Sequence, residues 1–516
     1  MMMMNLKIQK SVLSNEKKVC ILIFTICFIV FLFTSNAHRY TIDDYLAYSQ
    51  GERIINQTPL ENFVPGQTRP GLDSSIIWYL PICTDAILCS GIPIGYSISF
   101  IPFIFIEQNL NLIPNYEFTS DDFDDPHYVW WRNSLSSVET FVFLTYGPIF
   151  TSISCVLVFL ITRTFEVNQK ISLFIAFLFG FATLTWAYSS TGLNVVLSTT
   201  IILTAFYCFR MFEKKKSYLY LFGVSLSIGF SFLVRYDLAI FGIILLGFLS
   251  YIILKQNRKI QYFSILSLPI LFMGLVFALT NLIQFGSIEK FGYINENGFG
   301  LGNTIPIYEG IAGLLFSPGA GLFVFSPILL TIFISFYDFR KYRISLVIFL
   351  SYFISILFFI GGLETWHGFV SWGARYMVPL IPFLLIPLAI SIQNRTSILF
   401  RIGIITSASI GAFFNFMWLV QDVSWFVWGL FGTNNGLYRL GIPGMHPLNL
   451  NPVVFWTFEH SQLTQSIYLA FTHLQVDLYL YKILGPVFTG ILLIVLLIPL
   501  LFFLKKLSNN QNLVTN

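Results

Sequence analysis

The sequence is poor in charged residues. Asp, Glu, Lys and Arg together make up 10% of its 516 residues, while 56% are hydrophobic. A soluble domain usually carries about 25% charged residues, and a soluble fold of this size could not cover its surface with so few. The composition therefore excludes a water-soluble protein and predicts one embedded in a lipid bilayer. The net charge of +4 is uninformative as a total, and we expect no nucleic acid as a partner.

Cysteine is also scarce, and the usual signatures of metal and nucleotide sites are missing. Of the six cysteines, four lie in apolar runs. Cys83 and Cys89 stand outside those runs with no histidine beside them, so a metal site there is not expected, although the two could pair in an oxidising compartment. Neither the glycine and lysine spacing of a phosphate loop nor that of a calcium-binding EF-hand is present. Internal repeats are not apparent.

Long apolar runs dominate instead. Most are roughly 17–24 residues long, which matches the ~20 helical residues needed to cross ~30 Å of hydrocarbon. A β-barrel would show alternating strands of ~10 residues. The sequence therefore predicts an all-α polytopic membrane protein with about 12 transmembrane helices. The predicted spans are 19–35, 135–162, 171–189, 193–210, 218–234, 238–254, 262–282, 321–337, 344–361, 377–392, 398–420 and 483–504.

The charges divide the chain between two sides of the membrane. If the N-terminus is inside, twenty of the 29 lysines and arginines fall in inner turns, and all but four of the 25 acids fall outside. This distribution follows the positive-inside rule. It predicts a cytoplasmic-membrane protein with both termini in the cytoplasm and its active face outside. The predicted parts are a cytoplasmic N-terminus (1–18), a transmembrane core (19–420), an outer loop (421–481), and a last helix with a cytoplasmic tail (482–516).

The first outer loop, 38–134, is large and contains an ambiguous apolar stretch at 76–106. Prolines and Asp85 interrupt this stretch, which reads either as two short spans or as helices lying in the outer interface. A single span is excluded because it would invert the charge pattern of every later turn. We favour interfacial helices, because a carboxylate at mid-bilayer costs roughly 2.5–3.5 kcal/mol.

Two adjacent acids, Asp43 and Asp44, follow the first span directly. One interpretation is structural: Thr41 or Asp43 caps a short helix and the acids occupy its first turn. A second interpretation adds chemistry at the same place. A carboxylate held by a helix start at the membrane surface can act as a general base, which is typically worth roughly 10²–10⁴ in rate.

Cationic residues on the outer face are few, and two are candidates for binding an anion. Arg375 lies in the short outer loop 362–376, and its planar fork suits phosphate; the alternative is an ion pair with Glu364. Lys290 is the second candidate. Arg235 and Asp237 flank a very short outer turn, which favours a structural ion pair between them.

Three features together resemble the GT-C superfamily of membrane glycosyltransferases. They are the acidic pair after the first span, the large first outer loop, and the run Ser371-Trp372-Gly373-Ala374-Arg375-Tyr376 followed by Pro379 and Pro382. The nearest kin would be uncharacterised bacterial or archaeal relatives of the protein O-mannosyltransferase and aminoarabinose transferase group. The family's acidic motif is usually Asp-Glu, whereas this chain has Asp43-Asp44. A lysine-bearing element of the family's first loop has no match at 91–95.

The resemblance implies a GT-C-like fold and an enzyme that transfers a sugar, with inversion, from an outward-facing polyprenyl-phosphate-sugar to a hydroxyl acceptor on a protein, lipid or cell-envelope glycan. It implies that Asp43 is the base, that Asp44 positions it or the acceptor, and that Arg375 with Lys290 holds the lipid phosphate. Further donor or acceptor contacts are expected from nearby side chains: Tyr45, Tyr293, Trp366, His367, Trp372 and Tyr376. A requirement for a divalent metal is left open.

The alternative is a multi-spanning lipid or glycan flippase, or a secondary transporter, without transferase activity. Transporters place ionisable residues within their spans near the midplane. In this sequence the predicted spans are almost free of charge and the candidate acids and cations lie at the outer face, which favours chemistry at the membrane surface.

Overall fold

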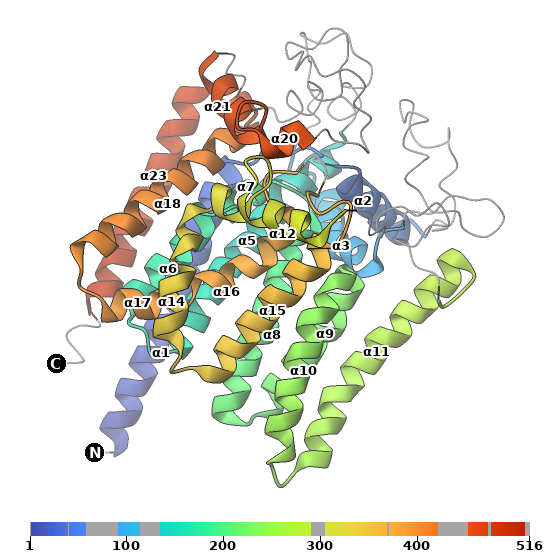
Figure 1. Cartoon of the computed structure of the whole chain (residues 1–516), viewed down its shortest axis with the longest axis vertical. Coiled ribbons are helices and arrows are strands. Elements are labelled where there is room, and N and C mark those ends of the chain that lie inside the picture. Colours follow the sequence, from blue (N-terminus) through green and yellow to red (C-terminus); the bar gives the residue numbers. More distant parts are fainter. Residues whose placement is uncertain are drawn as a thin grey trace.

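The chain is helical in the part that the structure describes (Figure 1). The computed structural model describes residues 2–39, 41–57, 91–113, 135–289, 305–368, 371–421, 452–472 and 476–510. In these ranges the only extended pairing is an isolated antiparallel bridge between Gln421 and Val476. The helices are α1 (Met2–Phe33), α2 (Ile42–Ile55), α3 (Ile94–Leu110), α5 (Ser137–Thr164), α6 (Gln169–Phe181), α7 (Thr185–Tyr188), α8 (Asn194–Lys215), α9 (Tyr218–Val234), η3 (Tyr236–Leu238), α10 (Ala239–Leu254), α11 (Lys259–Phe285), α12 (Ile307–Phe316), α13 (Leu322–Phe325), η4 (Pro327–Thr331), α14 (Ile332–Phe339), α15 (Arg343–Gly361), η5 (Arg375–Leu380), α16 (Ile381–Leu385), α17 (Leu388–Asn394), α18 (Ile398–Leu419), α20 (Pro452–Trp456), α21 (Gln462–Thr472), α22 (Tyr479–Leu484) and α23 (Pro486–Asn510).

Eight stretches of helix are long and apolar enough to cross a membrane, which indicates a helical, multi-pass membrane protein. They are α5, α8, η3 with α10, α11, α15, the segment Arg375–Asn394, α18 and α23. Three other predicted spans correspond to the shorter apolar helices α6, α9 and η4 with α14. The first predicted span is carried by the C-terminal half of α1. The total of twelve spans stays a prediction.

Three of these stretches form the centre of the bundle. In α5, α8 and the segment Arg375–Asn394, 72%, 78% and 83% of the most apolar window is buried inside the protein, against 11% in α11 and 6% in α23. The exposed apolar faces of α11 and α23 suit a lipid environment. Arg375 therefore begins the most enclosed of the eight candidate spans.

A backbone contact fixes the link between α7 and α8 against α5. A Cβ atom on Gly147 would lie 2.3 Å from the carbonyl oxygen of Ser189 and 2.6 Å from that of Thr191, so only glycine allows this approach. The same link presents Gly192 to α2, where an added Cβ would lie 3.3 Å from the Cβ of Asp44. The central helix α5 thereby helps to position the start of α2.

The ion pairs divide into two groups that match the charge pattern of the sequence. Figure 1 places the first turn of α1 and the last turn of α23 at the end of the bundle opposite α2, α20 and α21. Every ion pair in the described ranges joins two residues assigned to the same side. The pairs assigned to the inner side are Arg163–Glu16, Arg210–Glu213, Lys341–Glu166 and Arg395–Asp338. Those assigned to the outer side are His38–Asp477, Lys482–Asp477, Arg39–Glu139, Arg235–Asp237 and Arg375–Asp43.

The close approach at Gly147 predicts that Gly147→Ala destabilises the protein. The added methyl group would overlap two backbone oxygens, and overpacking of this kind costs about 1–3 kcal/mol. Gly247→Ala in α10 is the matched control, because nothing lies within 4 Å of a Cβ placed there and alanine favours helix. Thermal unfolding in detergent should show a lower midpoint for Gly147→Ala alone. Equal midpoints for the two variants would contradict the contact.

Candidate active site at the outer face

The two adjacent acids open helix α2, but they have different roles. Thr41 is the N-cap: its Oγ1 accepts a hydrogen bond from the Asp43 backbone N–H at 3.2 Å, and Oδ1 of Asp44 accepts one from the Thr41 N–H at 3.0 Å. This reciprocal arrangement is a capping box, and it confirms that the acids begin a helix. Asp44 is completely buried beside Gly192, whose carbonyl accepts the Tyr96 hydroxyl at 2.6 Å. Asp44 therefore fixes the geometry of the first turn of α2, whereas the Asp43 side chain takes no part in the cap.

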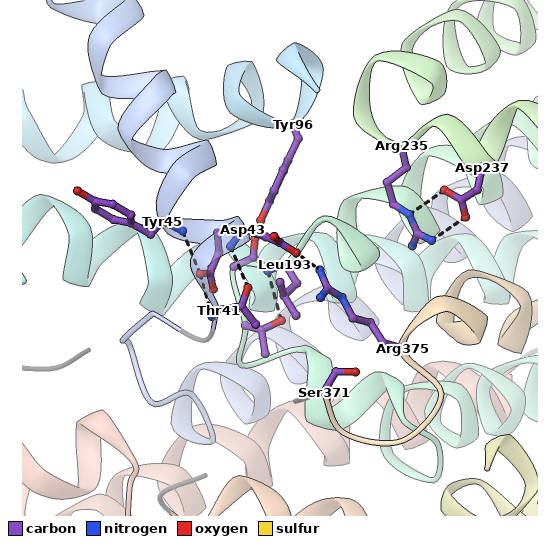
Figure 2. Close-up of polar contacts among 12 residues, drawn as sticks. Thr41, Asp43, Tyr45, Tyr96, Leu193, Arg235, Asp237, Ser371 and Arg375 are labelled. Carbon is purple, nitrogen blue, oxygen red and sulfur yellow. Dashed lines mark hydrogen bonds and ion pairs between the residues drawn. The ribbon is translucent and has the colours of Figure 1, made fainter. Parts of the chain in front are cut away.

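Asp43 meets Arg375 across 332 positions of sequence (Figure 2). Nη2 of Arg375 donates to Oδ2 of Asp43 at 2.7 Å, and the side chains are 8% and 33% exposed, respectively. Arg375 lies at the end of the bundle that the charge pattern assigns to the outer side, and it is buried. Its partner is Asp43 and not Glu364, which is exposed. The predicted base and the predicted phosphate ligand are thus direct neighbours.

The loop before Arg375 is held from inside the protein. Trp372 is 1% exposed; its indole N–H donates to Asn415 Oδ1 at 3.0 Å and its ring stacks on Trp418. The Tyr188 hydroxyl donates to the Trp372 carbonyl at 2.8 Å. Gly373 follows with a φ of +57°, a conformation that favours glycine. Trp372, expected among the ligand contacts, is thus a core residue whose contacts fix the position of Arg375.

Arg235 and Asp237 form the predicted ion pair, and they lie near the same site. Nε and Nη2 of Arg235 donate to the two carboxylate oxygens of Asp237 at 3.0 and 2.6 Å. The Cζ of Arg235 is 5.8 Å from the centre of the Tyr376 ring, and the Cζ of Arg375 is 6.0 Å from it. Two arginines, each with one acidic partner, therefore lie around one partly buried tyrosine.

The other aromatic candidates occupy two separate places. Tyr45 lies under the guanidinium of Arg39, 4.5 Å from its Cζ, and Figure 2 shows its ring directed away from Arg375. Trp366 and His367 belong to a cluster with Phe455, on which His367 stacks with 4.4 Å between ring centres. Burial lowers the pKa of His367 to about 4, so the imidazole is neutral at neutral pH.

A buried ion pair near the site was not predicted. Arg39 Nη2 donates to Glu139 Oε1 at 2.6 Å, with both side chains almost completely buried. Glu139 also closes a capping box with Ser136 at the start of α5. The pattern Ser136-x-x-Glu139 is a recognisable capping signal, but its pairing with Arg39 has no local signature.

A second unpredicted contact connects the end of α1 with the segment before α22. His38 Nε2 lies 2.6 Å from Asp477 Oδ2, and Lys482 donates to the other oxygen of Asp477 at 2.5 Å. The Nδ1 of His38 lies 2.7 Å from the backbone oxygen of Arg39. Both ring nitrogens of His38 therefore face oxygen atoms, one of the backbone and one of a carboxylate.

The remaining predicted site residues, Lys290 and Tyr293, lie outside the described residues. So do Cys83 and Cys89, whereas Cys20, Cys27, Cys155 and Cys208 are free thiols. Within the described ranges, no three His, Cys, Asp or Glu side chains gather in a group that could hold a metal ion. A metal requirement stays an open question for the chain as a whole.

His367 predicts a pH dependence of stability. An unfolded histidine takes up a proton near pH 6.5, whereas the folded one does so only near pH 4. The unfolded state therefore binds more protons between these values, and stability falls as the pH drops from 6.5 to 4, by at most about 3 kcal/mol.

His367→Phe keeps the stacking on Phe455 and removes this proton uptake. The unfolding midpoint in detergent, measured at pH 7.5 and 4.5, should fall less in His367→Phe than in the wild type. If His367→Phe lost as much stability as the wild type between pH 7.5 and 4.5, the conclusion that the His367 imidazole is buried and neutral would be wrong.

No protein-family model matches the chain, and no curated protein is significantly similar to it. The resemblance to the membrane glycosyltransferases therefore stays a prediction from short motifs, and evidence for a function comes from the residues around Asp43 and Arg375.

Proposed function

We propose that this protein is an integral-membrane glycosyltransferase. It transfers a sugar, with inversion, from an outward-facing polyprenyl-phosphate-sugar to a hydroxyl group on a protein, lipid or cell-envelope glycan. In this proposal the fold is GT-C-like with twelve spans, and the active face lies outside the cytoplasm. One observation carries the proposal: Asp43 and Arg375, which have the complementary chemistry of a base and an anion ligand, are in contact at 2.7 Å.

The chemistry needs one base and one cation. The acceptor oxygen attacks the anomeric carbon of the sugar while the bond from that carbon to the phosphate oxygen breaks. The acceptor proton passes to the Asp43 carboxylate, and the departing polyprenyl phosphate takes the electron pair. Arg375 stabilises the charge that develops on the phosphate. Because phosphate is a good leaving group, no acid is required on that side.

The exposure of the two acids supports Asp43, and not Asp44, as the base. Asp43 is 33% exposed, whereas Asp44 has no exposed surface and uses an oxygen to cap α2. An acceptor hydroxyl can reach Asp43 alone. Asp44 acts by holding the backbone that carries Asp43, which agrees with the positioning role proposed for it.

The ion pair between Arg375 and Asp43 also affects the order of donor binding and proton transfer. While Arg375 donates to Oδ2 of Asp43, the guanidinium occupies the oxygen that an acceptor hydroxyl would otherwise approach. A lipid phosphate competes with Asp43 for the same guanidinium. Donor binding therefore draws Arg375 away and leaves Asp43 free to accept a proton.

Asp43→Asn should separate catalysis from donor binding. Without the carboxylate, sugar transfer falls by about 10²–10⁴-fold. The neutral amide competes less well for Arg375, so polyprenyl phosphate should bind more tightly. A partly exposed ion pair contributes about 1 kcal/mol, which corresponds to an affinity increase of about fivefold. Transfer is measured with the purified protein in lipid nanodiscs and a polyprenyl-phosphate-sugar, and binding with polyprenyl phosphate.

Arg375→Ala provides the opposite case, with weaker binding of the phosphate and slower transfer. Glu364→Gln is the matched control, since it removes an exposed negative charge from the same loop without touching the pair. It should alter neither quantity. Normal transfer by a folded Asp43→Asn variant would remove Asp43 as the base. Phosphate binding with no transfer by the wild type would instead favour a flippase.

A further inference from the structure

The guanidinium of Arg235 has an N–H donor, Nη1, that does not bond to Asp237. Its side chain is 6% exposed, and Asp237 accepts from Nε and Nη2. Nη1 is buried without a hydrogen-bond partner among the described residues, and so is Nε of Arg375. An unsatisfied buried donor costs about 1–3 kcal/mol, more when the group is charged. Two such donors close together in a native protein call for an explanation.

The two donors belong to arginines that both lie near the ring of Tyr376. Each Cζ lies within 6.0 Å of the centre of the Tyr376 ring. Figure 2 shows the Arg235 guanidinium directed towards the side of the site that carries Arg375, whose own guanidinium is directed towards Asp43. A single ligand with several acceptor oxygens could therefore reach both arginines. Phosphate has such oxygens, and it favours the planar fork of arginine.

An apolar cavity begins beside Arg235. It is lined by the next residue, Tyr236, by Leu233 of α9, by Pro93 before α3, and by Phe277, Asn281 and Phe285 of α11. Only 11% of the apolar window of α11 is buried in the protein, so the cavity lies against a helix whose face suits lipid. The cavity itself has a volume of only about 10 Å³ and is too small for a lipid chain. The exposed apolar face of α11 beside it is the surface along which the chain of a ligand can lie while its charged head is at the arginines.

We propose that Arg235 is a second phosphate-binding residue of the site and holds the head group of the lipid together with Arg375. Asp237 is a positioning residue that orients the guanidinium and leaves Nη1 for the ligand. The inference rests on the proposed function for the identity of the lipid, a polyprenyl phosphate. A monophosphate and a diphosphate share the chemistry described, and the test distinguishes them.

The test compares three lipids of equal chain length: a polyprenyl monophosphate, the diphosphate and the uncharged polyprenol. Full-length protein is placed in nanodiscs of phosphatidylcholine, and dissociation constants are measured for each lipid. Arg235→Gln should weaken binding of the phosphate lipids about 10- to 100-fold, the effect of losing a hydrogen bond to a charged group. Polyprenol binding should stay within about twofold. A larger loss for the diphosphate identifies it as the preferred head group, and a larger loss for the monophosphate identifies that one.

Two further variants keep the result interpretable. Arg235→Lys retains a positive charge and most of the packing, so it covers the case in which Arg235→Gln does not fold; we expect an intermediate affinity for the phosphate lipids. Arg210→Gln is the matched control, because Arg210 is a partly buried arginine paired with Glu213 on the inner side. It should leave all three affinities unchanged.

The outcomes separate the two proposals. Unchanged phosphate affinity in Arg235→Gln and Arg235→Lys, with a loss in Arg375→Ala, overturns the role of Arg235 and leaves the proposed function intact. Equal losses for polyprenol and the phosphates also overturn it, because they show a packing role. In the third outcome, the wild-type protein binds the phosphate lipids more tightly than polyprenol, Arg235→Gln removes this preference, and the wild type transfers no sugar. This result supports Arg235 as a phosphate-binding residue and contradicts the proposed transferase activity.

Discussion

Several charged side chains at the end of the bundle assigned to the outer side are buried, and each of these needs a partner. Removing one member of a buried ion pair costs about 3–5 kcal/mol, because the other is left without compensation. Arg39 and Glu139 are the extreme case, with side chains 1% and 0% exposed. Arg235–Asp237 and Arg375–Asp43 are more open. The pairs connect α1, α2, α5 and the segment Arg375–Asn394, so pairing the charges also brings together residues far apart in sequence.

The same constraint gives the candidate site its chemical character. A pair with both members fully enclosed, such as Arg39–Glu139, has little freedom to exchange partners, and its role is structural. The Arg375–Asp43 pair is asymmetric, because the arginine is enclosed while the acid is 33% exposed. An incoming anion can replace Asp43 at Arg375 without leaving the arginine unpaired. The displaced carboxylate keeps access to solvent or to an acceptor, so exchange there is far less costly than at Arg39.

Much of the fold was predictable because the relevant signals are local. Apolar runs of the right length predicted the helices. The two-sided charge pattern agrees with the ion pairs of the described residues, each of which joins residues assigned to the same side. The acidic pair and Arg375 were each selected from short motifs. Their contact was not predictable, since nothing within a few residues of Asp43 refers to a partner 332 positions away. The pairing of Arg39 with Glu139 and of His38 with Asp477 escaped prediction for the same reason. Trp372 was expected among the donor or acceptor contacts, because its neighbours in sequence do not show the burial given by Asn415 and Trp418.

The capping box links the local signals to the site. The third position of such a box usually holds Glu or Gln, and here the shorter Asp44 still reaches the Thr41 N–H at 3.0 Å. Because that contact uses Asp44 and buries it, the second acid of the pair is committed to structure, and the first is left to face Arg375. Two adjacent carboxylates that look equivalent in sequence thus take different roles once a helix begins between Thr41 and Asp43: one caps the helix and the other pairs with Arg375. The departure from an Asp-Glu motif therefore changes the length of a capping side chain, while the proposed base keeps the same residue type.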